Sequence, residues 1–483
     1  MRLDALANSD APLGALSGDI EISGITSDSR AVEPGYLFAA LPGVNVDGSK
    51  FIGQAFEKGA VAALAGVECE GPGVINVENP RQVFSRMAAR FFHAQPEIAV
   101  AVTGTNGKTS VVAFVRQIWQ ALGLRAASMG TVGVIGPEGP EPLAHTTPDP
   151  VILHKFLSSL AHRKVSHVAL EASSHGLAQH RMDGVRMTAG AFTNLSRDHL
   201  DYHKDFEDYF TQKLRLFAEV LQPGCAAVVN ADFAEAGRII EVAENRGLSI
   251  ITVGEAGKTL RLVSAEPQGY GQLLLIDDVN GDRHEIYLPL IGEFQASNAL
   301  VAAGLVIAAG HSDIRSVLLA LENLKGAKGR LDLVGTTKAG ALVMVDFAHT
   351  PDALVTALSA LRPYVRGKLH VAFGAGGDRD PGKRPQMGAA AAEHADIVYV
   401  TDDNPRTENA ASIREAVLAE CPGAVEIGDR RKAIAHAVSN AGEGDIVLIA
   451  GKGHEPGQTI GTETFPFSDH EEVLAAIAGG NAQ

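Results

Sequence analysis

Short, wholly apolar segments recur along the chain and alternate with amphipathic stretches of helical period. Such segments suit parallel strands that are buried on both faces, because a half-solvated strand would alternate apolar and polar residues. The alternation of strands and helices therefore predicts an α/β fold with parallel sheets. We expect strands at residues 98–103, 167–172, 189–194, 225–230, 341–347, 369–376, 396–402 and 445–451, and helices at 110–122, 351–364 and 411–420.

Polar side chains gather where these predicted strands end. Glu171, Asn194 and Asp346 each close one strand, and polar, often glycine-rich runs follow others at 374–380, 402–406 and 451–455. In open parallel sheets, ligands bind beyond the carboxyl ends of the strands. We therefore expect the binding sites at these strand ends.

The length of 483 residues suggests about three domains. We place the limits at 1–96, 97–327 and 328–483, near breaks at 91–98 and 324–332. The net charge of −16 argues against nucleic-acid or anionic-membrane partners. Three well-separated cysteines indicate neither disulfides nor zinc, and no apolar run is long enough for a membrane anchor. We expect a cytoplasmic protein, most simply a monomer.

The stretch "AVTGTNGKTSVVAF" (101–114) lies between a predicted strand and a predicted helix. Gly104 and Gly107 permit the close approach that cradling a polyphosphate requires, Lys108 supplies a cation, and Thr109 supplies a hydroxyl for Mg²⁺. The strict phosphate-loop pattern asks for a glycine where this chain has Val102. The alternative is a glycine turn with a surface lysine.

Seven ordered motifs resemble those of the Mur ligase family of peptidoglycan synthesis, most closely its diaminopimelate-adding members. They are "GTNGKTS" (104–110), "EASSHGL" (171–177), "NLSRDHLDYH" (194–203), "DFAHTPDAL" (346–354), "GAGGDRDPGKRP" (374–385), "DDNPRTE" (402–408) and "GKGHE" (451–455). The resemblance implies an ATP- and Mg²⁺-dependent amide ligase with a UDP-sugar-binding N-terminal domain, a central P-loop ATPase domain and a C-terminal Rossmann-like amino-acid domain. In that reaction ATP phosphorylates a carboxylate, and an amine then attacks the acyl phosphate.

The resemblance also assigns the nucleotide and metal positions. It implies that ATP contacts Gly104, Thr105, Asn106, Gly107, Lys108, Thr109, Ser110, Asn298, Arg330 and Asp346. Thr109 and Glu171 are candidate Mg²⁺ ligands on chemical grounds as well, because this ion prefers hard oxygen donors. His199 and a carbamylated Lys213 would hold a second magnesium, and Lys108, Glu171, His199 and Lys213 would form the catalytic set. Without the resemblance, Glu171 alone could cap a helix, an alternative that the neighbouring loop weakens. Asp346 is equally an N-cap, and the segment of His199 is equally a helix cap with surface residues. Lys213 would be an exposed lysine on an amphipathic helix.

The acid substrate implied by the resemblance is a UDP-N-acetylmuramoyl dipeptide. Its uridine diphosphate would contact Ser27, Ser29, Val44, Asn45 and Val46, and its dipeptide His145, Thr146, Thr147, Ser173, Gln179 and Arg181. An arginine is a suitable partner for a substrate carboxylate. His145 and Gln295 stand where the family often has asparagine.

The amine substrate implied by the resemblance is meso-diaminopimelate, whose far end carries an ammonium and a carboxylate. Its pocket would comprise Arg379, Asp403, Asn404, Pro405, Arg406, Gly451 and Glu455. A guanidinium can grip the distal carboxylate, while carboxylates can accept from the ammonium. The alternative meaning of "DDNPR" is a turn with a surface ion pair.

Three other functions are compatible with these patterns. A lysine-adding relative would share nearly all of them, and folylpolyglutamate synthase would lack the segment of about a hundred residues before the phosphate loop. A nucleotide-binding switch or scaffold would hydrolyse ATP slowly whichever acid and amine were present.

Overall fold

The structure is a computed structural model that describes residues 1–43, 47–69, 71–196 and 202–479. The chain divides into two compact units. The first unit comprises Met1–Arg261, Asp278–Asn280 and Leu300–Val317, and the second comprises Leu262–Asp277, Gly281–Ala299 and Leu318–Gln483. Parallel strand pairs in both units confirm the predicted α/β class. The predicted domain limits stay predictions.

The N-terminal part of the first unit is a four-stranded parallel sheet with helices on both faces. Its strands are β1 (Gly24–Thr26), β2 (Tyr36–Ala39), β3 (Ala62–Gly66) and β4 (Val74–Val77). Helices α1 (Leu3–Ala7) and α3 (Pro80–Phe92) share a core with one face, and α2 (Ile52–Glu57) shares a core with the other.

The rest of the first unit is built around β5 (Ile98–Thr103), which lies between β9 (His167–Glu171) and β10 (Ala189–Phe192). All three strands run parallel, so their carboxyl ends share one edge. The flanking strands are β6 (Ala126–Gly130), β7 (Gly133–Gly136) and β8 (Gly139–Glu141) on one side, and β11 (Ala226–Asn230) and β12 (Ser249–Gly254) on the other.

Helices cover both faces of these strands because apolar residues predominate on each face. Helix α4 (Lys108–Ala121) packs against β5, β6 and β9. Helices α5 (Pro150–His162), α7 (Phe206–Arg215) and α8 (Ala236–Asn245) contribute to a second core with alternate strand residues. The short helix α6 (Ser174–Ala178) begins just after β9.

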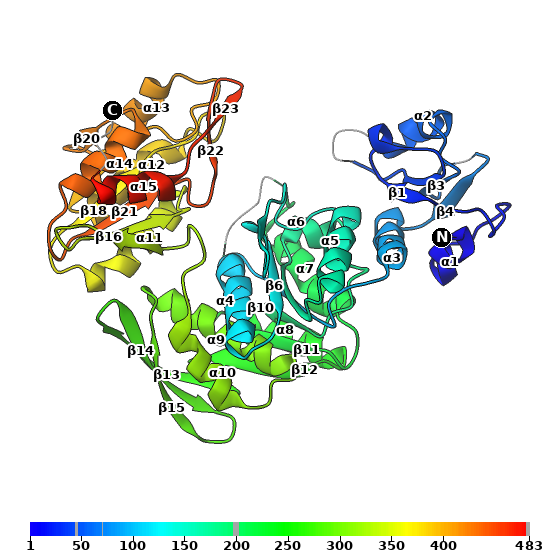
Figure 1. Ribbon diagram of the computed structural model, residues 1–483, viewed down its shortest axis with the longest axis horizontal. Helices are drawn as coiled ribbons and strands as arrows, with labels where there is room; N and C mark the ends of the chain where they lie inside the picture. The colour runs from blue at the N-terminus through cyan, green and yellow to red at the C-terminus, as the bar shows by residue number, and fades with distance from the viewer. Residues whose placement is uncertain (44–46, 70, 197–201, 480–483) are drawn as a thin grey trace. The chain divides into compact units, whose positions relative to one another are not determined.

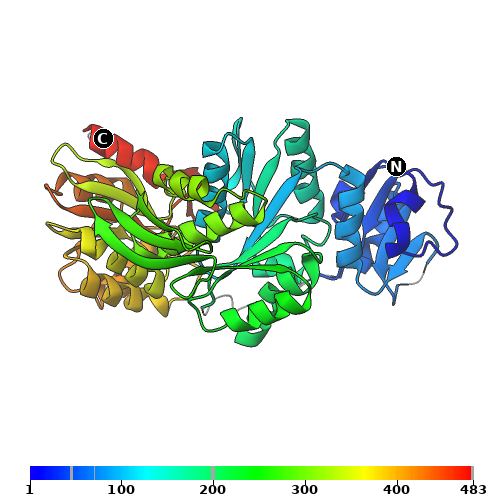
Figure 2. The same cartoon turned by 90° about the horizontal axis from the view of Figure 1, so that it is seen from below.

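The second unit contains a six-stranded sheet between two helical layers (Figures 1 and 2). Its strand order is β16 (Asp332–Thr336), β17 (Leu342–Asp346), β21 (Ile446–Ala450), β18 (Leu369–Phe373), β19 (Ile397–Val400) and β20 (Val425–Glu426), with only the β16 pairing antiparallel among those described. Leu342 and Met344 face one core and Val343 and Val345 the other, the alternation expected of a strand buried on both faces.

The helical layers divide by sequence. Helices α11 (Pro351–Leu361), α12 (Lys383–His394) and α13 (Ala410–Leu418) share one core, while α14 (Arg430–Ser439) and α15 (Asp469–Ala478) contribute to the other. A hairpin of β22 (Gly457–Ile460) and β23 (Glu463–Pro466) follows the last sheet strand.

Residues 260–320 are assigned in alternating stretches to the first and the second unit. They form β13 (Leu260–Gln268), β14 (Gly271–Asp278), β15 (Arg283–Leu288), α9 (Glu293–Ala308) and α10 (Ile314–Ala320). No helix in the described part of the chain is both long and apolar enough to cross a membrane. The predicted strand at 369–376 ends earlier, at Phe373. At the next residue, Gly374, a Cβ would lie 2.3 Å from the carbonyl oxygen of Thr401.

Candidate active site

The loop between β5 and α4 needs glycine at two positions. Gly104 has φ +134°, and a Cβ there would lie 2.0 Å from the Oγ1 of Thr193. Gly107 caps α4 in the left-handed region, with φ +85°. Val102, at the place of the missing pattern glycine, is a buried β5 residue paired with Glu171, so the tight turn begins only after it. The loop thus has the backbone of a phosphate cradle without the first glycine.

Neighbouring polar groups hold this loop rigidly. The N–H groups of Thr105 and Asn106 donate to the carbonyl and side-chain oxygens of Asn194, each at 2.9 Å. The Nζ atom of Lys108 donates to the carbonyls of Gly104 at 3.0 Å and Thr105 at 2.8 Å. Helix α4 begins at Lys108, so its first N–H groups lack intrahelical acceptors and favour an anion. The arrangement suits a polyphosphate.

Lys213 lies against the same loop from helix α7. Its side chain is 1% exposed, its Nζ donates to the carbonyl of Gly104 at 2.7 Å, and the nitrogen lies 4.4 Å from the ring centroid of Tyr209. The Tyr209 hydroxyl in turn donates to the Oγ1 of Thr105 at 3.1 Å. The alternative of an exposed surface lysine is wrong, because packing against the loop buries this face of α7.

Glu171, at the end of β9, is 2% exposed. Its Oε1 accepts from the N–H of Thr131 at 2.9 Å and its Oε2 from the hydroxyl of Thr131 at 3.1 Å. The helix-cap alternative is wrong for Glu171, because Ser173 caps the following helix. Thr109, the other proposed magnesium ligand, is 4% exposed at the start of α4. The two side chains offer a carboxylate and a hydroxyl near adjacent parallel strand ends, a donor set that fits Mg²⁺.

The proposed dipeptide contacts gather beside Glu171. Thr146 shares a hydrogen bond of 3.0 Å with Thr131, and Thr147 donates to the Glu171 carbonyl at 2.7 Å. The hydroxyl of Thr147 also accepts from the N–H of Ser173 at 3.0 Å. These bonds join four of the predicted positions into one cluster.

Arg181 belongs to the same cluster. Its Nη1 donates to the carbonyl of Thr147 at 2.5 Å, and its Nε and Nη2 donate to the Oε1 of Gln179 at 3.2 and 2.8 Å. The guanidinium is thus held by two other predicted dipeptide positions, Thr147 and Gln179. His145 is exposed, and the structure shows no described contact that explains it.

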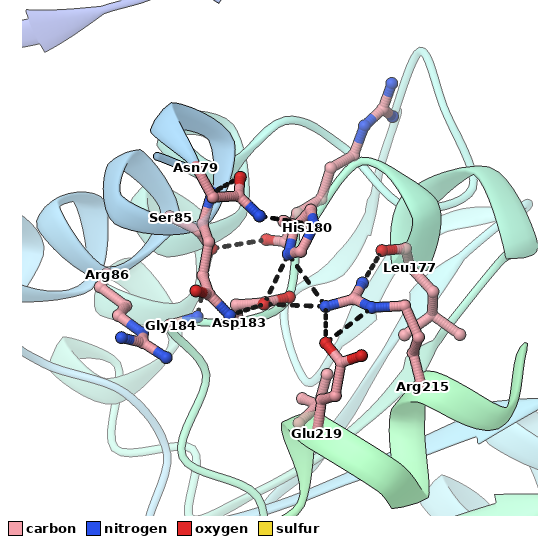
Figure 3. A network of polar contacts seen from close by, with 12 residues as sticks. Asn79, Ser85, Arg86, Leu177, His180, Asp183, Gly184, Arg215 and Glu219 are labelled. Carbon is pink, nitrogen blue, oxygen red and sulfur yellow. Dashed lines mark hydrogen bonds and ion pairs between the residues drawn. The ribbon is translucent and has the colours of Figure 1, made fainter. Parts of the chain in front are cut away.

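A polar network that the sequence did not indicate includes His180 and Asp183, on either side of Arg181 in the chain (Figure 3). The Nη2 of Arg215 donates to the Oδ1 of Asp183 at 3.1 Å, and this nitrogen also lies 2.9 Å from the Nδ1 of His180. The Nε2 of His180 lies 3.0 Å from the Nδ2 of Asn79, and the Ser85 hydroxyl donates to the Arg181 carbonyl at 3.2 Å.

This network joins helix α7, the turn that carries Arg181, and helix α3. Arg215 also pairs with Glu219 at 2.7 Å and donates to the carbonyl of Leu177. Arg215 and Asp183 are nearly buried and lie far apart in the sequence, so no local sequence pattern predicts their ion pair. The network supports the residues around the candidate dipeptide site.

Some predicted positions cannot be placed. Val44, Asn45, Val46 and His199 lie outside the described residues. Ser27 is exposed, and Ser29 opens a short 3₁₀ helix capped by Asp28. No group of three or more His, Cys, Asp or Glu side chains able to hold a metal occurs among the described residues.

In the second unit, Asp346 is the last residue of β17. Its carboxylate accepts hydrogen bonds from backbone N–H groups outside helix α11. Its Oδ2 accepts from the N–H of Leu331 at 2.6 Å and its Oδ1 from that of Ala348 at 2.8 Å. Burial raises the pKa of Asp346, although the Arg330 guanidinium opposes the rise. The alternative N-cap role is wrong, because Thr350 caps α11.

The other predicted nucleoside contacts lie near this carboxylate. Arg330 stacks over the ring of Phe347 at 5.0 Å. Asn298 donates to the Oε1 of Gln295 at 3.3 Å, and Gln295 donates to the carbonyl of Arg330 at 3.4 Å. Gln295 is buried and links the two predicted residues, so this departure from the family pattern has a structural role.

The proposed amine pocket is buried, which makes the surface-turn alternative wrong for its centre. Asp403 and Asn404 are 8% and 6% exposed. The Nδ2 of Asn404 donates to the Oε2 of Glu455 at 3.0 Å. A Cβ on Gly451 would lie 2.7 Å from the Oδ2 of Asp403, so a glycine at this position avoids a side-chain clash with that carboxylate. Burial raises the pKa of Asp403 despite nearby cations.

Two arginines of the proposed amine pocket lie beside Gly376. Arg406 has φ +51°, and its Nη1 donates to the carbonyl of Gly377 at 2.6 Å. Pro405, the residue before it, is buried. Arg379 is exposed, with its Cγ 3.8 Å from a Cβ built on Gly376, where the Nη1 of Arg406 is also close at 3.0 Å. Lys452, which was not predicted, is fully buried and donates to Asn404 and Glu455.

Comparison with known proteins agrees with the motifs over the whole chain. Family models described as "Mur ligase family, catalytic domain", "Mur ligase middle domain" and "Mur ligase, glutamate ligase domain" match residues 21–92, 102–306 and 329–453. A UDP-N-acetylmuramoyl-L-alanyl-D-glutamate–2,6-diaminopimelate ligase of Mesorhizobium japonicum is 52% identical over 481 residues, covering 99% of each chain. One of the same name from Caulobacter vibrioides is also 52% identical, covering 96% of this chain and 97% of its own.

Solved structures give the same result. A structure of a ligase with that name aligns with a TM-score of 0.75 and 33% identity over 99% of both chains. The MurF ligase of Thermotoga maritima, solved in complex with ADP, aligns with a TM-score of 0.60 over 95% of this chain and 98% of its own. Its identity of 16% supports the shared fold alone.

Proposed function

The chain belongs to the Mur ligase family, and from that premise we propose that it joins meso-diaminopimelate to UDP-N-acetylmuramoyl-L-alanyl-D-glutamate at the expense of ATP. The observation that carries the proposal is the 52% identity, over nearly the full length of both chains, to a ligase of that name. The reaction contributes to peptidoglycan precursor synthesis.

The chemistry requires activation of an inert carboxylate. ATP transfers its γ-phosphoryl group to the substrate carboxylate, releasing ADP. The amine then attacks the acyl carbon, and the C–O bond to the phosphate breaks to release inorganic phosphate. Bound Mg²⁺, with Thr109 and Glu171 as proposed ligands, would neutralise charge on the polyphosphate. Lys108 would hold the transferring phosphoryl group as a fixed cation.

The phosphate loop supports the nucleotide part of this proposal. Gly104 has no room for a side chain, and its carbonyl accepts from both Lys108 and Lys213. A preorganised loop of this kind favours transition-state stabilisation. Asn298, Arg330 and Asp346 are the proposed contacts of the adenosine.

The acid and amine substrates are assigned to separate clusters. The first comprises the strand-end residues around Glu171, with Arg181 proposed to hold a dipeptide carboxylate. The second comprises Asp403, Asn404 and Glu455, proposed to accept from the distal ammonium, with Arg406 on the distal carboxylate. The carbamate on Lys213, the His199 metal contact, the uridine contacts, the monomeric state and the cytoplasmic location are proposed on the resemblance alone.

One assay tests the function directly. ADP release is measured with ATP, Mg²⁺ and the UDP-muramoyl dipeptide against a panel of amino acids that includes meso-diaminopimelate, L-lysine and L-glutamate. We expect release that depends on both the dipeptide and diaminopimelate. Release independent of either substrate would indicate a switch, and equal use of L-lysine would indicate the lysine-adding relative.

A further inference from the structure

A lysine lies fully buried between two residues of the proposed amine pocket. Lys452 follows β21 and is 0% exposed. Its Nζ donates to the Oδ1 of Asn404 and to the Oε2 of Glu455, both at 3.0 Å. Because Asn404 also donates to that Oε2 at 3.0 Å, the three side chains form a closed ring of hydrogen bonds. A buried ammonium is costly unless it is paired, so this ring fixes Lys452 in one position.

The ring leaves one side of Glu455 for a ligand. Every hydrogen bond and ion pair that the described residues make with its carboxylate ends on Oε2. Burial by itself would raise the pKa of Glu455, but the charge of Lys452 and the hydrogen bonds from Lys452 and Asn404 together hold the pKa below the ordinary value. Glu455 is therefore an ionised acceptor whose Oε1 retains its capacity for a substrate N–H group.

The charged groups around Lys452 also favour a substrate cation. Arg430 and Asp469 form a bidentate pair, with both side chains fully buried. Lys452 pairs with Glu455. Burial raises the pKa of Asp403 although Arg430 and Lys452 oppose the rise, so the ammonium of a substrate beside it would favour its ionised form.

We propose that Lys452 is a positioning residue of the amine pocket, which orients Asn404 and Glu455 and neutralises one of its two carboxylates. Glu455 then presents its Oε1 to the distal ammonium. Without Lys452, two adjacent carboxylates would repel each other, and Glu455 would lose the bond that sets its orientation. This inference rests on the proposed function, because it assigns the pocket to diaminopimelate.

Steady-state kinetics of the full-length enzyme test the inference. Lys452→Met removes the ammonium, and Lys452→Gln removes the charge while keeping a hydrogen-bond donor. We expect each to raise the KM for diaminopimelate at least about 30-fold, because one partner of a buried charge pair is lost. The KM values for ATP and the UDP-dipeptide should change by less than about threefold. Lys368→Met is the matched control, since Lys368 is exposed before β18, at the opposite end of the strands.

A double-mutant cycle separates positioning from a general effect on folding. Glu455→Gln removes the charge that Lys452 balances, so adding Lys452→Met to it should change the KM for diaminopimelate little further. The double variant carries neither charge and is less prone to misfold than Lys452→Met alone. The inference would be overturned if Lys452→Met raised the KM for diaminopimelate by the same factor in the wild type and in Glu455→Gln. An unchanged KM in folded Lys452→Gln would overturn it as well. Absence of diaminopimelate-dependent ADP release in the wild type would instead overturn the proposed function.

Discussion

The Nζ atom of Lys213 donates a hydrogen bond of 2.7 Å to the carbonyl of Gly104, across 109 residues of sequence. This contact places the lysine proposed to be carbamylated directly against the phosphate loop. A carbamate retains one N–H on that nitrogen, so the bond to Gly104 is compatible with the modification. The new oxygens would supply the anionic donors that a second magnesium needs.

Lys213→Ala is expected to reduce ligase turnover by about 100-fold or more, because the loop loses a buried contact and the proposed metal ligand. High bicarbonate should not restore activity, whereas a short carboxylic acid should restore part of it by supplying an anion. Lys204→Ala, which changes an exposed lysine before α7, is the control. An intact mass that shows an unmodified lysine in fully active enzyme would contradict the carbamate.

Gly104→Ala should inactivate the enzyme by distorting the phosphate loop. Its Cβ would lie 2.0 Å from the Oγ1 of Thr193 at a φ of +134°, so the loop must move. We expect kcat/KM for ATP to fall by about 100-fold, since displacements near 1 Å have such effects. Gly123→Ala is matched, because Gly123 has φ +82° but no atom within 4 Å of its built Cβ. Similar losses in both variants would show that backbone strain, rather than the clash, is responsible.

Arg406→Ala should weaken diaminopimelate binding selectively. Arg406 is anchored by Gly377 at 2.6 Å and is proposed to hold the distal carboxylate. Its removal should raise the KM for diaminopimelate about 30-fold or more and leave those for ATP and the UDP-dipeptide nearly unchanged. The exposed Arg366 provides the control variant Arg366→Ala. Wild-type enzyme should prefer diaminopimelate over L-lysine by about 10⁴-fold, and equal use of both would refute the role of Arg406.

Asp183→Asn should make unfolding less sensitive to acid. Burial tends to raise the pKa of Asp183, but hydrogen bonding to His180 and the charge of Arg215 lower it below the ordinary value. A depressed folded-state pKa contributes stability above about pH 4 that is lost as the pH falls through the folded pKa. At pH 7 we expect the variant to have a Tm lower by about 5 °C or more.

The measurement is the apparent Tm of wild type and Asp183→Asn between pH 7 and pH 2. The difference in Tm between the two proteins should become smaller as the pH falls. The wild type then loses the carboxylate charge of Asp183, which the variant lacks at every pH. The variant Asp19→Asn, at an exposed position, should show no such narrowing. A constant difference at every pH would mean that packing, rather than the carboxylate charge, determines the effect.

The amino-acid sequence by itself determined the class of fold and the phosphate loop. Wholly apolar runs fix buried parallel strands, and β5 has the predicted limits, Ile98–Thr103. Gly104 and Gly107 were recognisable because only glycine readily adopts their backbone angles. These features are local, since each depends on the properties of a few consecutive residues.

Only the tertiary structure decided which polar residues are buried and which residues they contact. Helix α7 is amphipathic, so its pattern allows Lys213 to be exposed, yet packing against Gly104 buries it. Lys452 and Asn404 are 48 residues apart, and Arg215 and Asp183 are 32 apart. Charges pair across such separations because burial without a partner is costly, and the chain fold, rather than local periodicity, selects the partner.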